Sequence, residues 1–112
     1  MTIEEKRNSL IECYRENIEM HMKDLRKATE ILNSIIVEKE KTFDQFGVNV
    51  KYFRKNGIEY TLDTALRDVN TEFECLEKSQ SAMEKYKYCN DDTIRKDYDF
   101  HELVMSIMEN AE

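Results

Sequence analysis

The sequence contains no proline, no tryptophan and only two glycines. Proline and glycine are the residues that most strongly disfavour a helix interior, so their scarcity predicts long, uninterrupted helices. No apolar run approaches the ~20 residues that a membrane helix needs, and residues 1–5 are polar and acidic rather than typical of a signal peptide. We therefore expect a cytoplasmic protein that does not interact with a membrane.

Cysteine chemistry is also sparse. Cys13, Cys75 and Cys89 form neither a CxxC motif nor a metal-ligand spacing. Because their number is odd and their spacing irregular, we expect reduced thiols, as is usual in the cytoplasm.

The chain has two histidines, which leaves little material for catalytic or metal sites. Di-iron helical bundles need Glu-x-x-His pairs, but Ile18 and Tyr98 stand three residues before His21 and His101. Cys13 and His21 would lie roughly 12 Å apart along one helix, too far for a nucleophile–base pair. We expect no enzymatic activity, no metal and no cofactor.

What is abundant is charge. Of the 112 residues, 37% are charged and 40% are apolar, and the net charge is −7. The length predicts one domain over residues 1–112, large enough to fold without disulfides. The acidic balance argues against a dedicated nucleic-acid-binding protein, which needs a basic surface.

The first helix is predicted over residues 3–46. Thr2 and Glu5 have the spacing of a capping box, and no helix breaker follows until Gly47. Apolar residues recur at heptad-like steps, with His21 on the same stripe as a polar residue that could fix helix register. The stripe consists of Ile11, Tyr14, Ile18, Leu25, Ala28, Leu32 and Ile35.

Residues 47–61 change character. Asn56 and Gly57 both tolerate the positive φ angles of a tight hairpin turn, and β-branched and aromatic residues flank them. The pattern predicts a short β-hairpin; the alternative is a plain loop.

A second helix is predicted over residues 62–88, with the stripe Leu62, Leu66, Val69, Phe73, Leu76 and Met83. Asn90, Asp91 and Asp92 should break it, and Asp99 with Glu102 predicts a third helix over residues 99–111. The expected fold is mostly α: an antiparallel helical hairpin or three-helix bundle with the hairpin or loop between its first two helices.

Two surfaces are candidates for binding a partner. The first is the tip, a basic and aromatic segment. It lies in residues 47–61, whose net charge is +2. Its aromatic side chains could instead cap the helical core. The tip consists of Lys51, Tyr52, Phe53, Arg54 and Lys55. The second is an acidic face, which could equally be a solvated helix surface: Glu77, Glu84, Asp91, Asp92, Asp97 and Asp99.

These features predict a small acidic protein that binds and inhibits another protein with a basic surface. Its composition, rich in Lys, Glu, Ile, Asn and Tyr, is common in phages and mobile elements of AT-rich bacteria. The sharpest hypothesis is therefore a phage antagonist of a nucleic-acid-binding host defence or toxin protein. The alternative is a structural or adaptor coiled-coil protein that assembles with itself; a homodimer is expected in either case. A third possibility, weak binding of nucleic acid through Lys51, Arg54 and Lys55, is less favoured.

Overall fold

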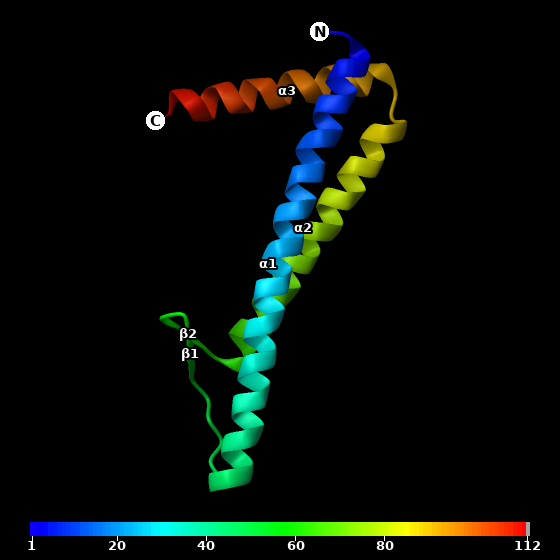
Figure 1. The fold of residues 1–112 in the computed structure, drawn as a ribbon. Helices are drawn as coiled ribbons and strands as arrows, with labels where there is room; N and C mark the ends of the chain where they lie inside the picture. Colours follow the sequence, from blue (N-terminus) through cyan, green and yellow to red (C-terminus); the bar gives the residue numbers. More distant parts are fainter. Residues whose placement is uncertain (112) are drawn as a thin grey trace. The chain divides into compact units, whose positions relative to one another are not determined.

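The computed structural model describes residues 1–111 and consists of helices with one small hairpin (Figure 1). The elements in chain order are α1 (Ile3–Phe46), β1 (Phe53–Lys55), β2 (Ile58–Tyr60), α2 (Leu62–Tyr88) and α3 (Asp91–Asn110). The mostly helical fold with a hairpin between the first two helices is as predicted, and the ends of α1 and α2 coincide with the expected ones.

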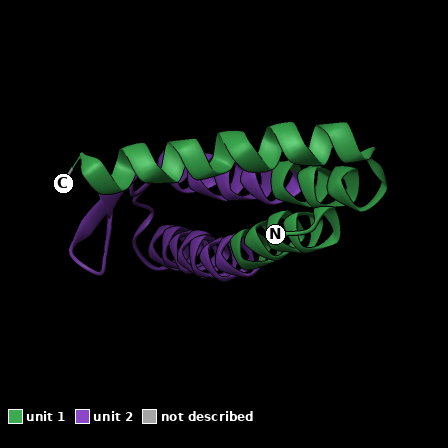
Figure 2. Ribbon diagram, turned by 90° about the horizontal axis from the view of Figure 1, so that it is seen from above, with its two compact units in different colours: residues 1–18, 78–112 green, residues 19–77 purple. Residues whose placement is uncertain are grey.

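The chain divides into two compact units, coloured separately in Figure 2. Unit 1 comprises residues 1–18 and 78–112, and unit 2 comprises residues 19–77. Whether they behave as one domain stays a prediction, so each unit is described by itself.

In unit 2 the hairpin covers one end of the helix pair. Phe53 faces Tyr60 across the antiparallel strands, and both side chains are buried against Ile35 of α1 and Ala65 of α2. The turn has φ angles of 53° at Asn56 and 78° at Gly57, the left-handed values that favour Asn-Gly. A two-stranded ribbon is marginal alone, and burial of its two aromatic rings supplies the missing stabilisation.

The inward face of α2 differs in part from the predicted stripe. Leu66 and Phe73 are exposed, and their places are taken by Ala65 and Glu72. The inward residues follow alternating steps of three and four, as in a coiled-coil seam, and we call them the α2 seam. It consists of Leu62, Ala65, Val69, Glu72, Leu76, Ser79, Met83 and Tyr86.

Unit 1 has its own core. Leu10 of α1, Tyr86 of α2 and Ile94 of α3 form a buried cluster, in which Ile94 is fully buried. The Tyr14 ring stacks on Tyr86 with a centroid separation of 5.6 Å. The cluster joins the start of α1 to α2 and α3, which lie at the other end of the sequence.

Helix α3 begins at Asp91, not at Asp99 as predicted. The Asn90 side chain accepts a hydrogen bond of 2.9 Å from the Thr93 backbone N–H, which makes Asn90 the N-cap. Asp91 and Asp92 then occupy the first turn, where negative charge is favourable. The segment 90–92 therefore follows the end of one helix and starts the next.

Arg7 stabilises this corner of unit 1. Its guanidinium donates to the Tyr86 carbonyl oxygen at 2.7 Å and contacts the Asp91 carboxylate at 3.3 Å. The carbonyl belongs to the last turn of α2, where backbone acceptors have no helical partner. One side chain thus satisfies the end of α2 and the start of α3.

No helix within residues 1–111 combines the length and the apolar composition that a bilayer-spanning segment requires.

Candidate protein-binding face

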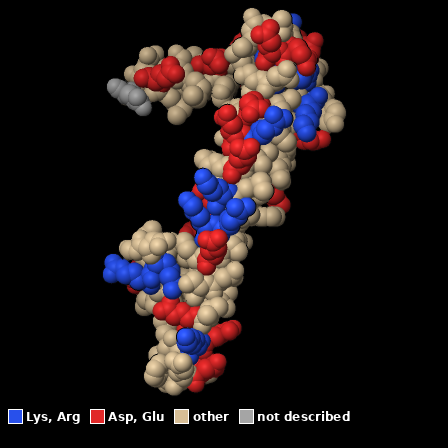
Figure 3. All heavy atoms as spheres, viewed as in Figure 1, with Lys and Arg blue, Asp and Glu red and all other residues tan. Residues whose placement is uncertain are grey.

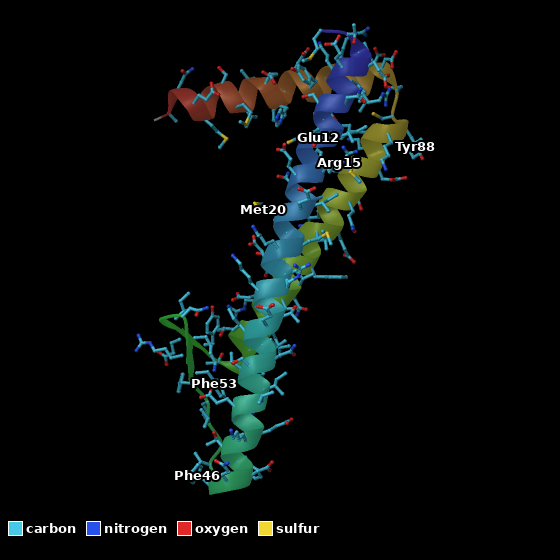
Figure 4. All side chains as sticks on the ribbon, in the orientation of Figure 1. Glu12, Arg15, Met20, Phe46, Phe53 and Tyr88 are labelled. Atoms are coloured by element: carbon cyan, nitrogen blue, oxygen red, sulfur yellow. The ribbon has the colours of Figure 1, made fainter. Side chains whose placement is uncertain are left out.

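The structure divides the predicted tip into buried and exposed residues. Phe53, only 3% exposed, lies in the core of unit 2, where it caps the helix pair (Figure 4). Lys55 forms an ion pair of 2.8 Å with Glu38 of α1. Lys51, Tyr52 and Arg54 remain exposed, so the surface available at the tip is smaller than the sequence suggested.

Much of the predicted acidic face makes contacts within unit 1. Asp91 pairs with Arg7, Asp99 pairs with Lys6 at 3.5 Å, and Asp97 accepts from Tyr86 at 2.7 Å. These three carboxylates are therefore already paired within unit 1, which leaves less of their charge for a partner.

Two further residues of the predicted acidic face form ion pairs within their own helices: Glu84 with Lys87 and Asp92 with Arg95. Glu77 is exposed on α2 and, within the part of the chain that the structure describes, forms no ion pair. Exposed pairs of this kind contribute little to stability.

A surface that the sequence did not single out lies on the C-terminal part of α3, and we call it the α3 face. It consists of Phe100, Leu103 and Ile107, which are 67%, 57% and 60% exposed. Their spacing of i, i+3 and i+7 places them along one side of the helix. The inward side of α3 is provided instead by Ile94, with Tyr98 packed against the unit 1 core.

The α3 face was missed because the third helix was expected to begin at Asp99. A helix with that start has one apolar face, which is expected to pack onto the other helices: Phe100, Leu103, Val104, Ile107 and Met108. Once Asn90 is recognised as the N-cap, the first turns of α3 supply the buried contacts. Phe100, Leu103 and Ile107 are then left mostly exposed, whereas Val104 is half-buried beside the unit 1 core.

The charge on the C-terminal part of α3 has one sign. Glu102 and Glu109 are exposed on the same helix, and no lysine or arginine follows Lys96 in the sequence. In Figure 3 the C-terminal part of α3 accordingly shows acidic but no basic side chains. An exposed apolar patch beside charge of one sign is typical of a binding surface.

His21 lies in the helix pair of unit 2, as its place on the α1 stripe predicted. Its Nδ1 is 3.1 Å from the Glu72 Oε2 of the α2 seam, and both side chains are largely buried. Asp24, one turn further along α1, brings a carboxylate to the same place, so that ligand atoms of all three residues lie within 4.8 Å of one another. The pairing with Glu72 could not be predicted from one helix alone.

The Cys13 thiol is poorly suited to nucleophilic chemistry. Burial, and next to it the nearby Glu16 carboxylate, raise the pKa of Cys13 above its model-compound value. Because the thiolate is the reactive form, a raised pKa lowers the reactivity of this cysteine at neutral pH.

Compared with protein-family models, curated proteins and solved structures, the chain matches none. Its functional assignment therefore depends on its own residues.

Proposed function

We propose that the protein is a non-catalytic binding protein whose α3 face docks onto a partner protein with a basic rim. The observation that carries the proposal is the exposed stripe of Phe100, Leu103 and Ile107 on a part of α3 that has acidic but no basic side chains. Anchors at i, i+3 and i+7 are the pattern by which an amphipathic helix binds a hydrophobic groove. Large apolar anchors provide most of the binding free energy in such interfaces.

The charge favours a basic partner over a second copy of the same face. The chain has a net charge of −7, and α3 from Phe100 onward carries acidic but no basic side chains, so two copies repel one another as they approach. Lysines or arginines around a partner's groove would instead attract these carboxylates and speed association.

Inhibition is the consequence we favour for such binding. A basic surface on the partner that serves to bind nucleic acid would be covered by the acidic helix, and the nucleic acid would be displaced. An antagonist of a nucleic-acid-binding defence or toxin protein, of the kind that phages encode, is the specific form of this proposal.

A designed peptide pair provides a direct test. The probe is an amphipathic helix with a leucine face and lysine flanks, and its match carries glutamate in place of lysine. We expect the lysine peptide to bind the protein at least tenfold more tightly, since one tenfold step corresponds to about 1.4 kcal/mol. Fluorescence anisotropy of labelled peptides measures both affinities.

Three variants locate the site. Leu103→Asp with Ile107→Asp should abolish binding, and Glu102→Gln with Glu109→Gln should reduce the preference for the lysine peptide. Glu74→Gln with Glu77→Gln, which removes the same charge from exposed positions of α2, should change neither. Equal binding of both peptides, or a loss caused by the α2 control, would refute the proposal.

A self-assembling structural protein is the second candidate, favoured by a different surface. On α1 of unit 2, Ile36 and Phe43 are exposed on one side of the helix. Charges of both signs, including Lys39 and Asp44, line the same hollow, and mixed charges permit contact with a second copy. Sedimentation equilibrium of the parent and of Ile36→Asp with Phe43→Asp distinguishes the two: a parent dimer that becomes a monomer in this variant would favour self-assembly.

A further inference from the structure

We propose that His21, Asp24 and Glu72 form a binding site for one divalent first-row transition-metal ion, with Zn²⁺ as the reference ligand. The site lies within the helix pair of unit 2 and is independent of the α3 face. Its three donors are an imidazole nitrogen and two carboxylates, and their ligand atoms lie within 4.8 Å of one another.

The position of these residues is the first argument. His21 lies on the inward stripe of α1 and Glu72 on the α2 seam, where the neighbouring inward residues Leu25, Val69 and Leu76 are apolar. Ionisable groups at such positions cost free energy unless each is compensated. A structural role alone would be served at lower cost by apolar side chains.

The charge balance is the second argument. Within residues 1–111, the only ion-pair partner of Glu72 is His21, and Asp24 takes part in no ion pair. Two carboxylates thus lie close together with one histidine, which pairs with Glu72 alone and carries charge only when protonated. A divalent cation neutralises both and requires the neutral form of the imidazole.

The geometry is the third argument. Zinc binds imidazole nitrogen and carboxylate oxygen at about 2.0–2.2 Å, which places neighbouring ligand atoms about 3–3.5 Å apart. The His21 Nδ1 and Glu72 Oε2 are already 3.1 Å apart. His21 and Asp24 are spaced i, i+3 and therefore project from the same side of α1, and the Asp24 carboxylate lies within 4.8 Å of the other two ligand atoms.

The donor set indicates the class of ion. Imidazole suits Zn²⁺, Fe²⁺ and Ni²⁺, whereas Mg²⁺ and Ca²⁺ prefer oxygen alone. Three protein ligands leave at least one position for water, as in open zinc sites. A bound ion would link α1 to α2 directly and stabilise the folded form in proportion to its occupancy.

The test is a titration of the metal-free full-length protein with Zn²⁺ by calorimetry, together with Co²⁺ absorption spectroscopy. We expect one saturable site per chain and a visible Co²⁺ spectrum of low-symmetry coordination without a thiolate-to-metal band. The last point separates this site from the three cysteines. A strong thiolate band, or heat that never saturates, would overturn the proposal.

Conservative variants keep the experiment interpretable. Glu72→Gln retains a side chain that can hydrogen-bond to His21, and Asp24→Asn retains the shape of Asp24, so both should fold with unchanged circular dichroism. Each should weaken Zn²⁺ binding at least about tenfold. His101→Ala, which removes the other histidine, and Leu103→Asp, which disrupts the α3 face, should leave Zn²⁺ binding unchanged.

A second readout does not depend on affinity. The two imidazoles give separate signals in nuclear magnetic resonance spectra, and Zn²⁺ should shift the His21 signals while leaving those of His101 in place. Equal shifts of both, or unaltered binding in Glu72→Gln, would exclude the site.

Discussion

The Tyr86 hydroxyl donates a hydrogen bond of 2.7 Å to the Asp97 carboxylate and so connects the last turn of α2 to α3. The same carboxylate also receives Lys85 at 3.3 Å. Because the Tyr86 ring is buried between Leu10 and Ile94, its hydroxyl both fixes the ring and orients the helix that presents the α3 face.

Removing this hydroxyl should destabilise unit 1. We expect Tyr86→Phe to lower the free energy of unfolding by about 1.5–3 kcal/mol, as is usual for a hydrogen bond to a charged group. Urea denaturation followed by circular dichroism measures the change. Tyr88→Phe, which alters a tyrosine that is 80% exposed (Figure 4), should cost less than about 0.5 kcal/mol.

The stability of the protein should also decrease at alkaline pH in a way that depends on Tyr86. Burial, and next to it the hydrogen bond to Asp97, raise the pKa of Tyr86 well above its ordinary value of 10.0. The unfolded chain therefore releases this proton at a lower pH than the folded chain. The contribution is fully present below pH 10.0 and is lost as the pH rises through the folded pKa.

The corresponding measurement compares the parent with Tyr86→Phe across this range. Their difference in unfolding free energy should shrink as the pH rises above about 10, by at most about 1.4 kcal/mol per pH unit. A difference that stays constant would mean that the hydroxyl is not held in its neutral form by the fold.

The stability of each unit should depend on one fully buried isoleucine. Ile94→Ala in unit 1 and Ile35→Ala in unit 2 should each cost about 2–5 kcal/mol, because both side chains are 0% exposed and a cavity would remain. Ile107→Ala on the α3 face serves as the control and should cost less than about 0.5 kcal/mol. Hydrogen exchange should show faster opening in the unit that carries the substitution; protection lost equally throughout the chain would mean that the units do not open separately.

The hairpin turn should be sensitive to a single methyl group. Gly57 has a φ angle of 78°, and a Cβ atom built there meets nothing within 4 Å. The cost of Gly57→Ala is therefore conformational and should be about 1 kcal/mol, without any steric contribution. Thermal unfolding measures it, with Glu59→Ala on the adjacent strand as control; no loss would indicate that the turn adopts another conformation.

The sequence was sufficient to predict α1, α2 and the hairpin because each has a local cause. The Thr2 hydroxyl accepts from the Glu5 backbone N–H at 3.1 Å, as the capping box requires, and Gly47 follows directly after α1. Asn56 and Gly57 adopt the positive φ angles from which the hairpin turn was predicted. These signals operate over a few residues and need no knowledge of the tertiary structure.

Other features depended on contacts between distant residues. Asn90 and Asp99 both resemble N-caps, and the choice between them depends on Ile94 reaching Leu10 and Tyr86. Ala65 is too small to stand out in an apolar pattern, although it is only 1% exposed. The binding surfaces were harder still to predict, because they depend on which charged residues are paired within the chain. The pairing of Arg7 with Asp91, for example, joins residues far apart in the sequence.

The connection between α1 and α2 also has a consequence for the speed of folding. The two helices of unit 2 are joined only through residues 47–61, and the hairpin in this connection pairs residues no more than seven positions apart, Phe53 with Tyr60. Such hairpins form in about 1–10 μs. Because the sequence contains no proline, prolyl isomerisation cannot slow its folding. Unit 2 should therefore assemble early, while the rest of the chain is still disordered.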